Sequence, residues 1–241
     1  MRLLVVIPTY NEAENLPRLV SALFALPLDL GVLVVDDNSP DGTGEIAEAL
    51  KARRPHHLDV LHRTEKNGLG PAYLAGFRKA LDTPGVEAIA QMDADFSHDP
   101  AVLPQMAALV ENGQADLVLG SRYVPGGRLD EQWPLWRKGL STFGNFYART
   151  ILRIPVRDVT GGYRLWRRET LAALPLARVH AAGYLFQVEM AYLAYKLGFR
   201  LAEVPIYFQE RQWGQSKMSF AIQIEAAIGV WRLLKRYRDL P

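Results

Sequence analysis

The sequence predicts an α/β protein with a doubly wound, mostly parallel sheet, and three observations lead to this fold class. Short apolar runs rich in β-branched residues recur along the first half of the chain, as buried strands do. Segments with helical spacing of apolar residues separate these runs, and such alternation favours a parallel sheet. Polar or acidic residues follow three of the runs, at the strand ends where open α/β sheets bind ligands.

The elements of the first 120 residues follow one another in regular order. Strands are expected near residues 3–7, 32–36, 58–61, 88–92 and 116–119. Helices are expected between them, for example at Gly44–Arg53, Pro71–Ala80 and Ala101–Asn112. Asn11 and Glu14 resemble a helix-start signal, but Pro17 moves the expected start of the first helix toward Asn15.

The pattern changes after Gly120. The stretch Tyr123–Leu140 is rich in Gly, Pro, Trp and Arg, which is typical of a long functional loop. The remaining elements are expected as helices at Phe143–Leu152 and Tyr184–Lys196, a strand at about Leu201–Phe208, and a helical stretch at Ser219–Tyr237. The last of these ends in a basic cluster and fits two interpretations, a helix in the lipid interface or a core helix with a solvated basic end.

Length and composition exclude several classes of protein. The 241 residues are 49% hydrophobic and 22% charged, which suits one large globular domain. The chain has no cysteine, so disulfides, thiolate metal sites and cysteine nucleophiles are excluded, and a cytoplasmic location is favoured. A net charge of +2 is too small to indicate a nucleic-acid partner. No signal peptide is evident, and no membrane span is expected, because no apolar run reaches ~18 residues.

The most informative motif is Asp93-Ala94-Asp95, which follows the apolar run of residues 88–92. Two carboxylates one residue apart at a strand end are hard oxygen ligands, which suit Mg²⁺ or Mn²⁺ and hence a substrate with phosphates. The alternative is an acidic loop that caps the next helix. His98 follows closely and is assigned to the turn Ser97–Pro100, which leads into that helix.

Two other strands end in polar residues. Asp36 and Asp37 follow the second strand, and a turn at Ser39–Gly42 does not explain why two acids should be adjacent. A carboxylate here could accept hydrogen bonds from a base or ribose. Tyr10 follows the first strand, where its ring could stack on a base, and Glu12 lies two residues on. These side chains are therefore expected at the same sheet edge as the Asp93 motif.

Several weaker signals remain open. Asn67–Gly70 opens a helix and fits either a phosphate-binding turn or a simple tight turn. Many of the later basic residues are expected to be solvated surface charges; the set is Arg122, Arg128, Arg137, Arg164, Arg211 and Lys217. Arg211 and Lys217 stand out because the unusual polar aromatic segment around Trp213 lies between them and could close over phosphates.

Seven ordered motifs resemble those of the dolichol-phosphate mannose synthases, which are inverting glycosyltransferases with an A-type nucleotide-sugar fold. They span nearly the whole chain: Pro8–Glu12, Val35–Gly42, Gly68–Gly70, Met92–Asp95, Gly120–Tyr123, Asp158–Arg164 and Gly214–Lys217. The resemblance implies a single glycosyltransferase domain over residues 1–241. Its parts would be a nucleotide-binding half (1–120), an acceptor and loop half (121–218) and a C-terminal amphipathic helix (219–241).

The resemblance also implies roles for matching positions in the first half. The nucleotide pocket would be formed by Pro8, Tyr10, Glu12, Val35 and Asp37. Asp93, Ala94 and Asp95 would form the metal and diphosphate site, with Asp93 and Asp95 as ligands of Mg²⁺ or Mn²⁺. Some relatives have a glutamine as a third metal contact two residues after the second acid, and Ser97 stands there in this chain.

In the second half, the resemblance implies residues that hold phosphates. Arg122 would contact phosphate at the reaction centre, and Arg137 with Ser141 would hold the phosphate of the acceptor. Arg211 and Lys217 would lie in a loop that clamps the donor. Asp95, Arg122 and Arg137 are therefore the catalytic candidates.

The activity implied by the resemblance is metal-dependent transfer of mannose from GDP-mannose to a polyprenyl or dolichyl phosphate, with inversion. Such an enzyme would be cytoplasmic or bound peripherally to the cytoplasmic face of a membrane. Two alternatives stay open: transfer of glucose or another sugar from a UDP-sugar to a polyprenyl phosphate or a hydroxyl acceptor, and a non-catalytic nucleotide-sugar binding module.

Overall fold

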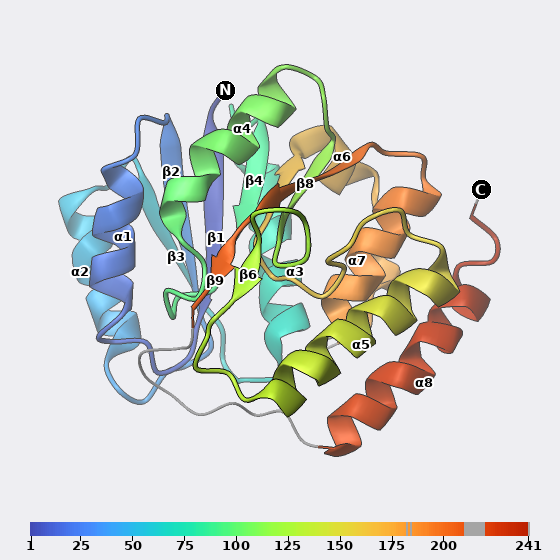
Figure 1. The fold of residues 1–241 in the computed structure, drawn as a ribbon. Coiled ribbons are helices and arrows are strands. Elements are labelled where there is room, and N and C mark those ends of the chain that lie inside the picture. Colours follow the sequence, from blue (N-terminus) through green and yellow to red (C-terminus); the bar gives the residue numbers. More distant parts are fainter. Residues whose placement is uncertain (182, 184, 210–219, 241) are drawn as a thin grey trace.

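A seven-stranded sheet forms the centre of the protein, in a computed structural model that describes residues 1–181, 183, 185–209 and 220–240 (Figure 1). The strand order is β3-β2-β1-β4-β7-β5-β8. The bounds are β1 Leu3–Thr9, β2 Leu30–Asp36, β3 Leu58–His62, β4 Ala88–Gln91, β5 Leu117–Ser121, β7 Arg164–Arg167 and β8 Leu201–Pro205. All neighbours are parallel except β7, which is antiparallel to β4 and β5. The predicted mostly parallel sheet is thus confirmed.

Helices cover both faces of this sheet, because successive strand side chains point to opposite sides. Leu3, Val5 and Ile7 pack in one core with α1, α2 and α4, whereas Leu4 and Val6 pack in a second core with α3, α6 and α7. Helices α5 and α8 pack against each other and flank the second core (Figure 1). The bounds are α1 Leu16–Phe24, α2 Thr43–Arg53, α3 Leu69–Asp82, α4 Leu103–Glu111, α5 Leu135–Leu152, α6 Arg168–Ala173, α7 Leu185–Lys196 and α8 Phe220–Arg236. Short 3₁₀ turns lie at Pro100–Val102 and Leu176–Arg178.

Helix α3 lies unusually close to the sheet because of one glycine. A Cβ atom at Gly76 would collide with a methyl group of Val6 in β1 and crowd Val35 in β2. Only a glycine lets the backbone of α3 approach these strands so closely. Since α3 also carries Tyr73, this packing fixes the distance of that side chain from the carboxyl ends of the strands.

The prediction of one long loop over Tyr123–Leu140 is wrong for two parts of that stretch. Residues Arg128–Leu129 form β6, which pairs with β9 (Tyr207–Phe208) in a small second sheet, and α5 already begins at Leu135. The helix was expected to start only at Phe143. Pro134, in an extended conformation, precedes the first helical turn, and the first two helical side chains, Leu135 and Trp136, are exposed. No periodic buried pattern therefore marked its start.

Two further expectations need correction. The predicted strand at about Leu201–Phe208 is two strands in different sheets, because Pro205 at the end of β8 has no N–H to continue a ladder. Strand β7 was not predicted, since it is a short antiparallel insertion within an otherwise alternating order. The start of the first helix after Asn15 is confirmed, as are the five strands of the first half.

Candidate active site

The carboxyl ends of β1, β2 and β4 lie next to one another at one edge of the sheet. In the parallel register Thr9 pairs with Asp36, and Val6 pairs with Gln91. The chain therefore leaves these three strands at Tyr10, Asp37 and Met92. The residues expected to bind nucleotide and metal thus lie at one edge of the sheet, as predicted. Their roles in binding stay predictions.

The adjacent acids Asp36 and Asp37 have different environments. Asp36 is buried and accepts hydrogen bonds from the Thr9 hydroxyl (3.0 Å) and from the Ser39 N–H (3.1 Å) and hydroxyl (2.6 Å). The turn was not expected to explain the adjacent acids, and this expectation is wrong for Asp36, whose carboxylate fixes the turn after β2. Burial raises the pKa of Asp37, although its ion pair with Arg63 opposes that shift. Asp37 is the acid of this pair that suits a nucleotide contact.

The other predicted nucleotide residues surround this position. Pro8 pairs with Val35 across the β1–β2 ladder, and the Val35 side chain lies in the core. The half-buried ring of Tyr10 lies under the Lys66 ammonium, which is 3.3 Å from the ring centroid. Glu12 accepts a hydrogen bond from the Asn15 side chain (2.8 Å). An aromatic face, a cation and a carboxylate are thus gathered beside Asp37, which suits a nucleoside diphosphate.

Neighbouring residues donate hydrogen bonds to both acids of the Asp93-Ala94-Asp95 motif. The Tyr73 hydroxyl of α3 donates to Oδ1 of Asp93 (3.0 Å). Ser97 donates to Oδ1 of Asp95 through its N–H (3.0 Å) and its hydroxyl (2.6 Å). Ala94 is buried between them. The two carboxylates are therefore fixed in orientation before any ligand binds.

Tyr73 is a site residue that the sequence did not reveal. Its side chain has no exposed surface and stacks on Phe186 in α7, with ring centroids 5.9 Å apart. Burial, followed by the charge of Asp93, raises the pKa of Tyr73 well above its usual value. The hydroxyl therefore stays protonated and acts as a permanent donor to Asp93.

His98 does more than lead into the next helix. Its Nδ1 accepts a hydrogen bond from the Asp93 N–H (3.2 Å), and its ring stacks on Tyr163, with centroids 5.2 Å apart. The start of the following 3₁₀ turn is capped instead by Asp99, whose side chain accepts from the Ala101 N–H (2.9 Å). His98 thus lies in the entry turn as expected, and its buried ring also supports the acidic loop.

The two acids fit a divalent cation that takes further ligands from a substrate. No group of three or more His, Asp or Glu side chains that could hold a metal occurs among the residues that the structure describes. Mg²⁺ and ions like it are commonly held by one or two carboxylates together with substrate phosphates and water. Ser97 already donates its hydroxyl to Asp95, so it orients that acid.

Arg122 is held in a buried ion pair rather than exposed to solvent. Its Nε and Nη2 donate to the two oxygens of Asp158 at 2.6 and 2.7 Å, and Nη2 also donates to the Thr160 hydroxyl (2.8 Å). Burial by itself would raise the pKa of Asp158, but the Arg122 charge outweighs it and holds that pKa below its usual value. Arg122 thus has a fixed position beyond the end of β5.

Helix α5 carries a row of polar side chains that leads toward Arg122. Arg137, Ser141 and Asn145 follow one another at intervals of four residues, which places them on one helix face. Ser141 accepts a hydrogen bond from the Tyr123 hydroxyl (2.7 Å), and Asn145 donates to the Thr160 hydroxyl (2.9 Å). The Arg137 guanidinium lies over the Trp133 ring, 3.7 Å from its centroid. We call this row and the Arg122–Asp158 pair the α5 polar row.

Arg164 was expected among the surface charges, and it is buried instead. It donates to the backbone oxygens of Gly161 (3.1 Å) and Val159 (2.8 Å), and burial lowers its pKa to about 9. Its Nη1 is buried without a hydrogen-bond partner in the described part of the chain. Arg164 therefore secures the loop that holds Asp158. Arg211, Lys217 and Trp213 lie outside the described residues.

Comparison with known proteins agrees with this fold. Residues 4–174 match glycosyl transferase family 2. The chain is 47% identical over its whole length to an undecaprenyl-phosphate mannosyltransferase of Micrococcus luteus, of which it covers 98%. It is 48% identical over 90% of its length to a polyprenol monophosphomannose synthase of Mycolicibacterium smegmatis, of which it covers 81%.

Solved structures share the fold at low identity. Glucosyl-3-phosphoglycerate synthase from Mycobacterium tuberculosis, in a complex with Mn²⁺, UDP and phosphoglyceric acid, is 18% identical with a TM-score of 0.66; the match covers 97% of this chain and 78% of that one. Mannosyl-3-phosphoglycerate synthase from Rubrobacter xylanophilus is 20% identical with a TM-score of 0.65, over 99% and 75% of the two chains.

The sheet topology and these likenesses define a glycosyltransferase with an A-type nucleotide-sugar fold. The chain belongs to glycosyl transferase family 2 and, within it, to the polyprenol-phosphate mannose synthases. None of the helices in residues 1–181, 185–209 and 220–240 is long and apolar enough to span a bilayer.

Proposed function

We propose that the protein transfers mannose from GDP-mannose to a polyprenyl phosphate, with a divalent cation and with inversion at the anomeric carbon. The observation that carries the proposal is the convergence of Asp37, Asp93 and Asp95 at one sheet edge, in a chain 47% identical to an undecaprenyl-phosphate mannosyltransferase. The residues that bind donor and acceptor are proposed from this placement.

The donor would lie along the strand ends. Tyr10 and Asp37 would bind the nucleoside, and Asp93 and Asp95 would hold Mg²⁺ or Mn²⁺ against the diphosphate. When bound, the cation supplies positive charge that stabilises the departing diphosphate. Tyr73 and Ser97 keep the two carboxylates in fixed orientations, so little reorganisation is needed when the donor binds. Arg211 and Lys217, which lie outside the described residues, are proposed to complete this pocket.

The acceptor would lie along the α5 polar row. Arg137 and Ser141 would hold the acceptor phosphate, and Arg122 would lie between donor and acceptor. A phosphate monoester has a second pKa near ~6, so it is largely dianionic at neutral pH and attacks without a general base. The main task of the site is then to hold two anionic substrates in line, which fixed cations such as Arg122 can do.

We propose that α5 and α8 face the membrane that holds the lipid acceptor. Six of the eight large hydrophobic side chains that are exposed in the described residues lie on these two helices. They are Leu135, Trp136, Phe143, Phe146, Ile228 and Trp231. Aromatic and aliphatic side chains in this arrangement suit the interfacial region of a bilayer. We accordingly propose that the chain has three functional parts: a nucleotide-binding half, an acceptor half and a C-terminal helix at the membrane.

A donor and acceptor screen tests the proposed function. GDP-mannose, GDP-glucose, UDP-glucose and UDP-galactose are offered with a radiolabelled lipid phosphate, and the product is separated as glycolipid. The proposal expects the fastest turnover with GDP-mannose. Preferred use of a UDP-sugar, or transfer only to hydroxyl acceptors, would contradict it. Binding of nucleotide sugars without any turnover would point to a binding module.

A further inference from the structure

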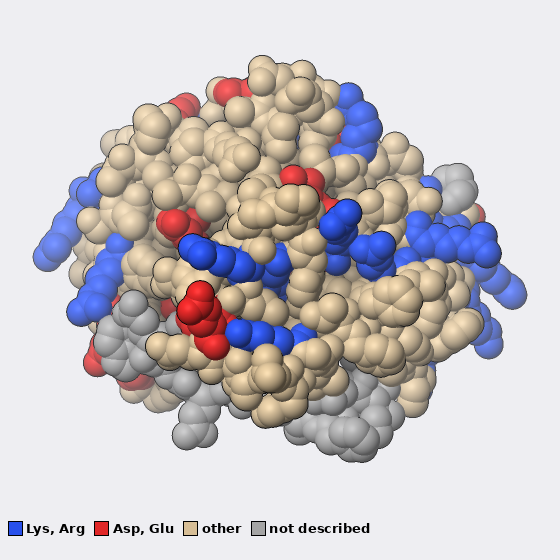
Figure 2. Space-filling model, in the orientation of Figure 1, with Lys and Arg blue, Asp and Glu red and all other residues tan. Residues whose placement is uncertain are grey.

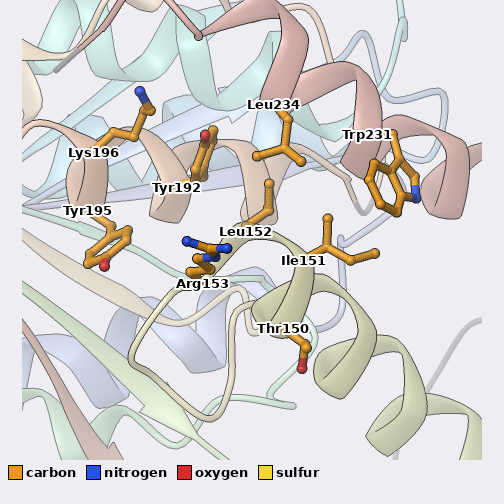
Figure 3. A pocket seen from close by; sticks show the side chains of 9 residues that line it. All are labelled: Thr150, Ile151, Leu152, Arg153, Tyr192, Tyr195, Lys196, Trp231 and Leu234. Atoms are coloured by element: carbon orange, nitrogen blue, oxygen red, sulfur yellow. The ribbon is translucent and has the colours of Figure 1, made fainter.

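A cleft with cationic side chains lies at the far end of α5 from the proposed acceptor site. It has a volume of about 850 Å³ and is lined by residues from the ends of α5 and α7 and from α8 (Figure 3). Arg153 follows the last turn of α5 and lies in the cleft with Tyr192 and Tyr195 of α7 (Figure 3). Since α5 rises ~1.5 Å per residue, Arg153 is about 24 Å along the helix from Arg137.

A second cavity beside α8 adds to this charge. It has a volume of about 420 Å³, and its four lining residues are Arg232, Lys235, Arg236 and Arg238. The two cavities have no Asp or Glu among their lining residues. Figure 2 shows Lys and Arg side chains gathered over the C-terminal ends of α5 and α8, next to a broad surface without charged side chains. Both cavities are lined by residues between Trp231 and Arg238, and we call the two together the basic cleft.

The nearby carboxylates are already paired with other residues. Glu189 binds Arg236 (3.0 Å), and Asp239 binds Arg178 (2.7 Å). No carboxylate pairs with Arg153, Arg232, Lys235 or Arg238 within the described residues. Lys196 donates to the backbone oxygen of Leu240 (2.8 Å). The charge of the basic cleft is therefore only partly compensated from within the protein.

Stabilisation of helix dipoles does not account for all of these cations. Basic residues at helix C-termini are favourable, and Arg149, Lys196 and Lys235 lie in the last turns of α5, α7 and α8. That effect explains about one cation for each helix end. The further cations Arg153, Arg232 and Arg238 remain, and their mutual repulsion favours a bound anion.

Apolar side chains border the same cleft. Trp231 lines it and is 58% exposed, and its indole N–H donates to the Tyr147 hydroxyl of α5 (2.8 Å). Ile228, one helical turn earlier, is also exposed. An apolar surface that continues into a group of cations suits an amphiphile with an anionic head, because chains and headgroup would each find a matching region.

We propose that the basic cleft binds the phosphate headgroup of an anionic phospholipid and so docks the α5–α8 face on an anionic membrane. The choice of a bilayer rests on the proposed lipid acceptor. The cleft itself is distinct from the acceptor site, which lies at the opposite end of α5. Docking at this end would set the height of Arg137 above the bilayer surface.

Vesicle flotation at low ionic strength tests the proposal. The vesicles are pure phosphatidylcholine or phosphatidylcholine mixed with phosphatidylglycerol. The double variant Arg153→Gln/Arg232→Gln is compared with Arg53→Gln/Arg78→Gln, which removes two exposed arginines of α2 and α3. Each cation near an anionic surface contributes about a fivefold change in binding, so the cleft variant should bind the mixed vesicles about thirtyfold more weakly. The control variant should bind like the wild type.

Several results would overturn the proposal. One is equal binding of the wild type to both kinds of vesicle, and another is binding of the cleft variants at the wild-type level. A third is that inorganic phosphate or glycerol phosphate binds as tightly as the mixed vesicles. A vesicle-independent dimer that the cleft variant dissociates would assign the cleft to a second copy of the chain. A second pair, Lys235→Gln/Arg238→Gln, gives the same test if Arg153→Gln lowers the melting temperature.

Sugar transfer in detergent separates this inference from the proposed function. Cleft variants should retain wild-type transfer to a short-chain lipid phosphate, because they lie outside the proposed active site. If the wild type binds anionic vesicles through the cleft but transfers no mannose, the proposed function fails and the inference holds. If the wild type transfers mannose but the cleft variants bind vesicles normally, the inference about the cleft fails and the proposed function holds.

Discussion

The hydrogen bond from Tyr73 to Asp93 gives a sharp test of how the acidic motif is prepared for a cation. Tyr73→Phe removes one hydroxyl and leaves the ring stacked between Phe77 and Phe186, so no cavity forms and the fold should be retained. The lost bond is to a charged group, which is typically worth about 1.5–3 kcal/mol. Loss of a residue that orients a metal ligand typically weakens metal binding by about 10- to 100-fold.

The prediction is therefore that Tyr73→Phe weakens Mn²⁺ binding by about 10- to 100-fold in the presence of GDP. The measurement is a Mn²⁺ titration followed by electron paramagnetic resonance, with the melting temperature as a check on folding. Tyr163→Phe is a matched control, because the Tyr163 hydroxyl is buried and has no hydrogen-bond partner in the described part of the chain. Unchanged Mn²⁺ binding in Tyr73→Phe, or equal weakening in both variants, would show that the Tyr73 hydroxyl does not orient Asp93 for the cation.

Three further predictions concern the α5 polar row. Asp158→Asn should lower the free energy of unfolding by about 3–5 kcal/mol in urea titrations, because it removes the carboxylate that balances the buried Arg122 charge. The pKa of Asp158 is lowered in the fold, so its contribution should be complete above the unfolded-state value of ~3.9 and be lost as the pH falls further. Wild-type stability should thus fall more than that of Asp158→Asn below about pH 4, and parallel pH curves would contradict this. Arg137→Lys should reduce acceptor kcat/KM by about 10- to 100-fold with GDP binding nearly unchanged, since lysine cannot form a two-bond fork with phosphate. Calorimetric loss of GDP binding with normal acceptor kinetics would show that this assignment is wrong.

The elements that could be predicted from the sequence are those with a repeating pattern of apolar residues. Strands β1 to β5 were predictable because each is a buried run flanked by turn residues, and such runs carry their own periodic signal. Strand β7 carries no such signal, since it is defined by its antiparallel partners β4 and β5. The start of α5 at Leu135 was hidden because its exposed face is apolar, which is the reverse of the usual amphipathic pattern.

The candidate site shows the same division. Asp37, Asp93 and Asp95 were predictable from their positions after buried strands. Tyr73 and His98 were not predictable. Tyr73 reaches Asp93 through the packing of α3 on the sheet, and His98 reaches it through the local course of the loop. The buried ion pair of Arg122 with Asp158 joins residues 36 positions apart, and no local pattern in the chain predicts that these two side chains meet. Motif residues reveal chemistry, whereas the residues that orient them require the structure.

The central claim is that Asp95 at the sheet edge serves cation-dependent sugar transfer to a lipid phosphate. The most direct measurement is transfer of radiolabelled mannose from GDP-mannose to polyprenyl phosphate by the wild type, Asp95→Ala and Asp99→Ala. Asp99 is an exposed acid four residues further on, so it controls for loss of charge near the loop. We expect labelled lipid with the wild type and Asp99→Ala in Mn²⁺, and none with Asp95→Ala or with excess EDTA. Labelled lipid formed at the wild-type rate by Asp95→Ala, or by the wild type in excess EDTA, would contradict it.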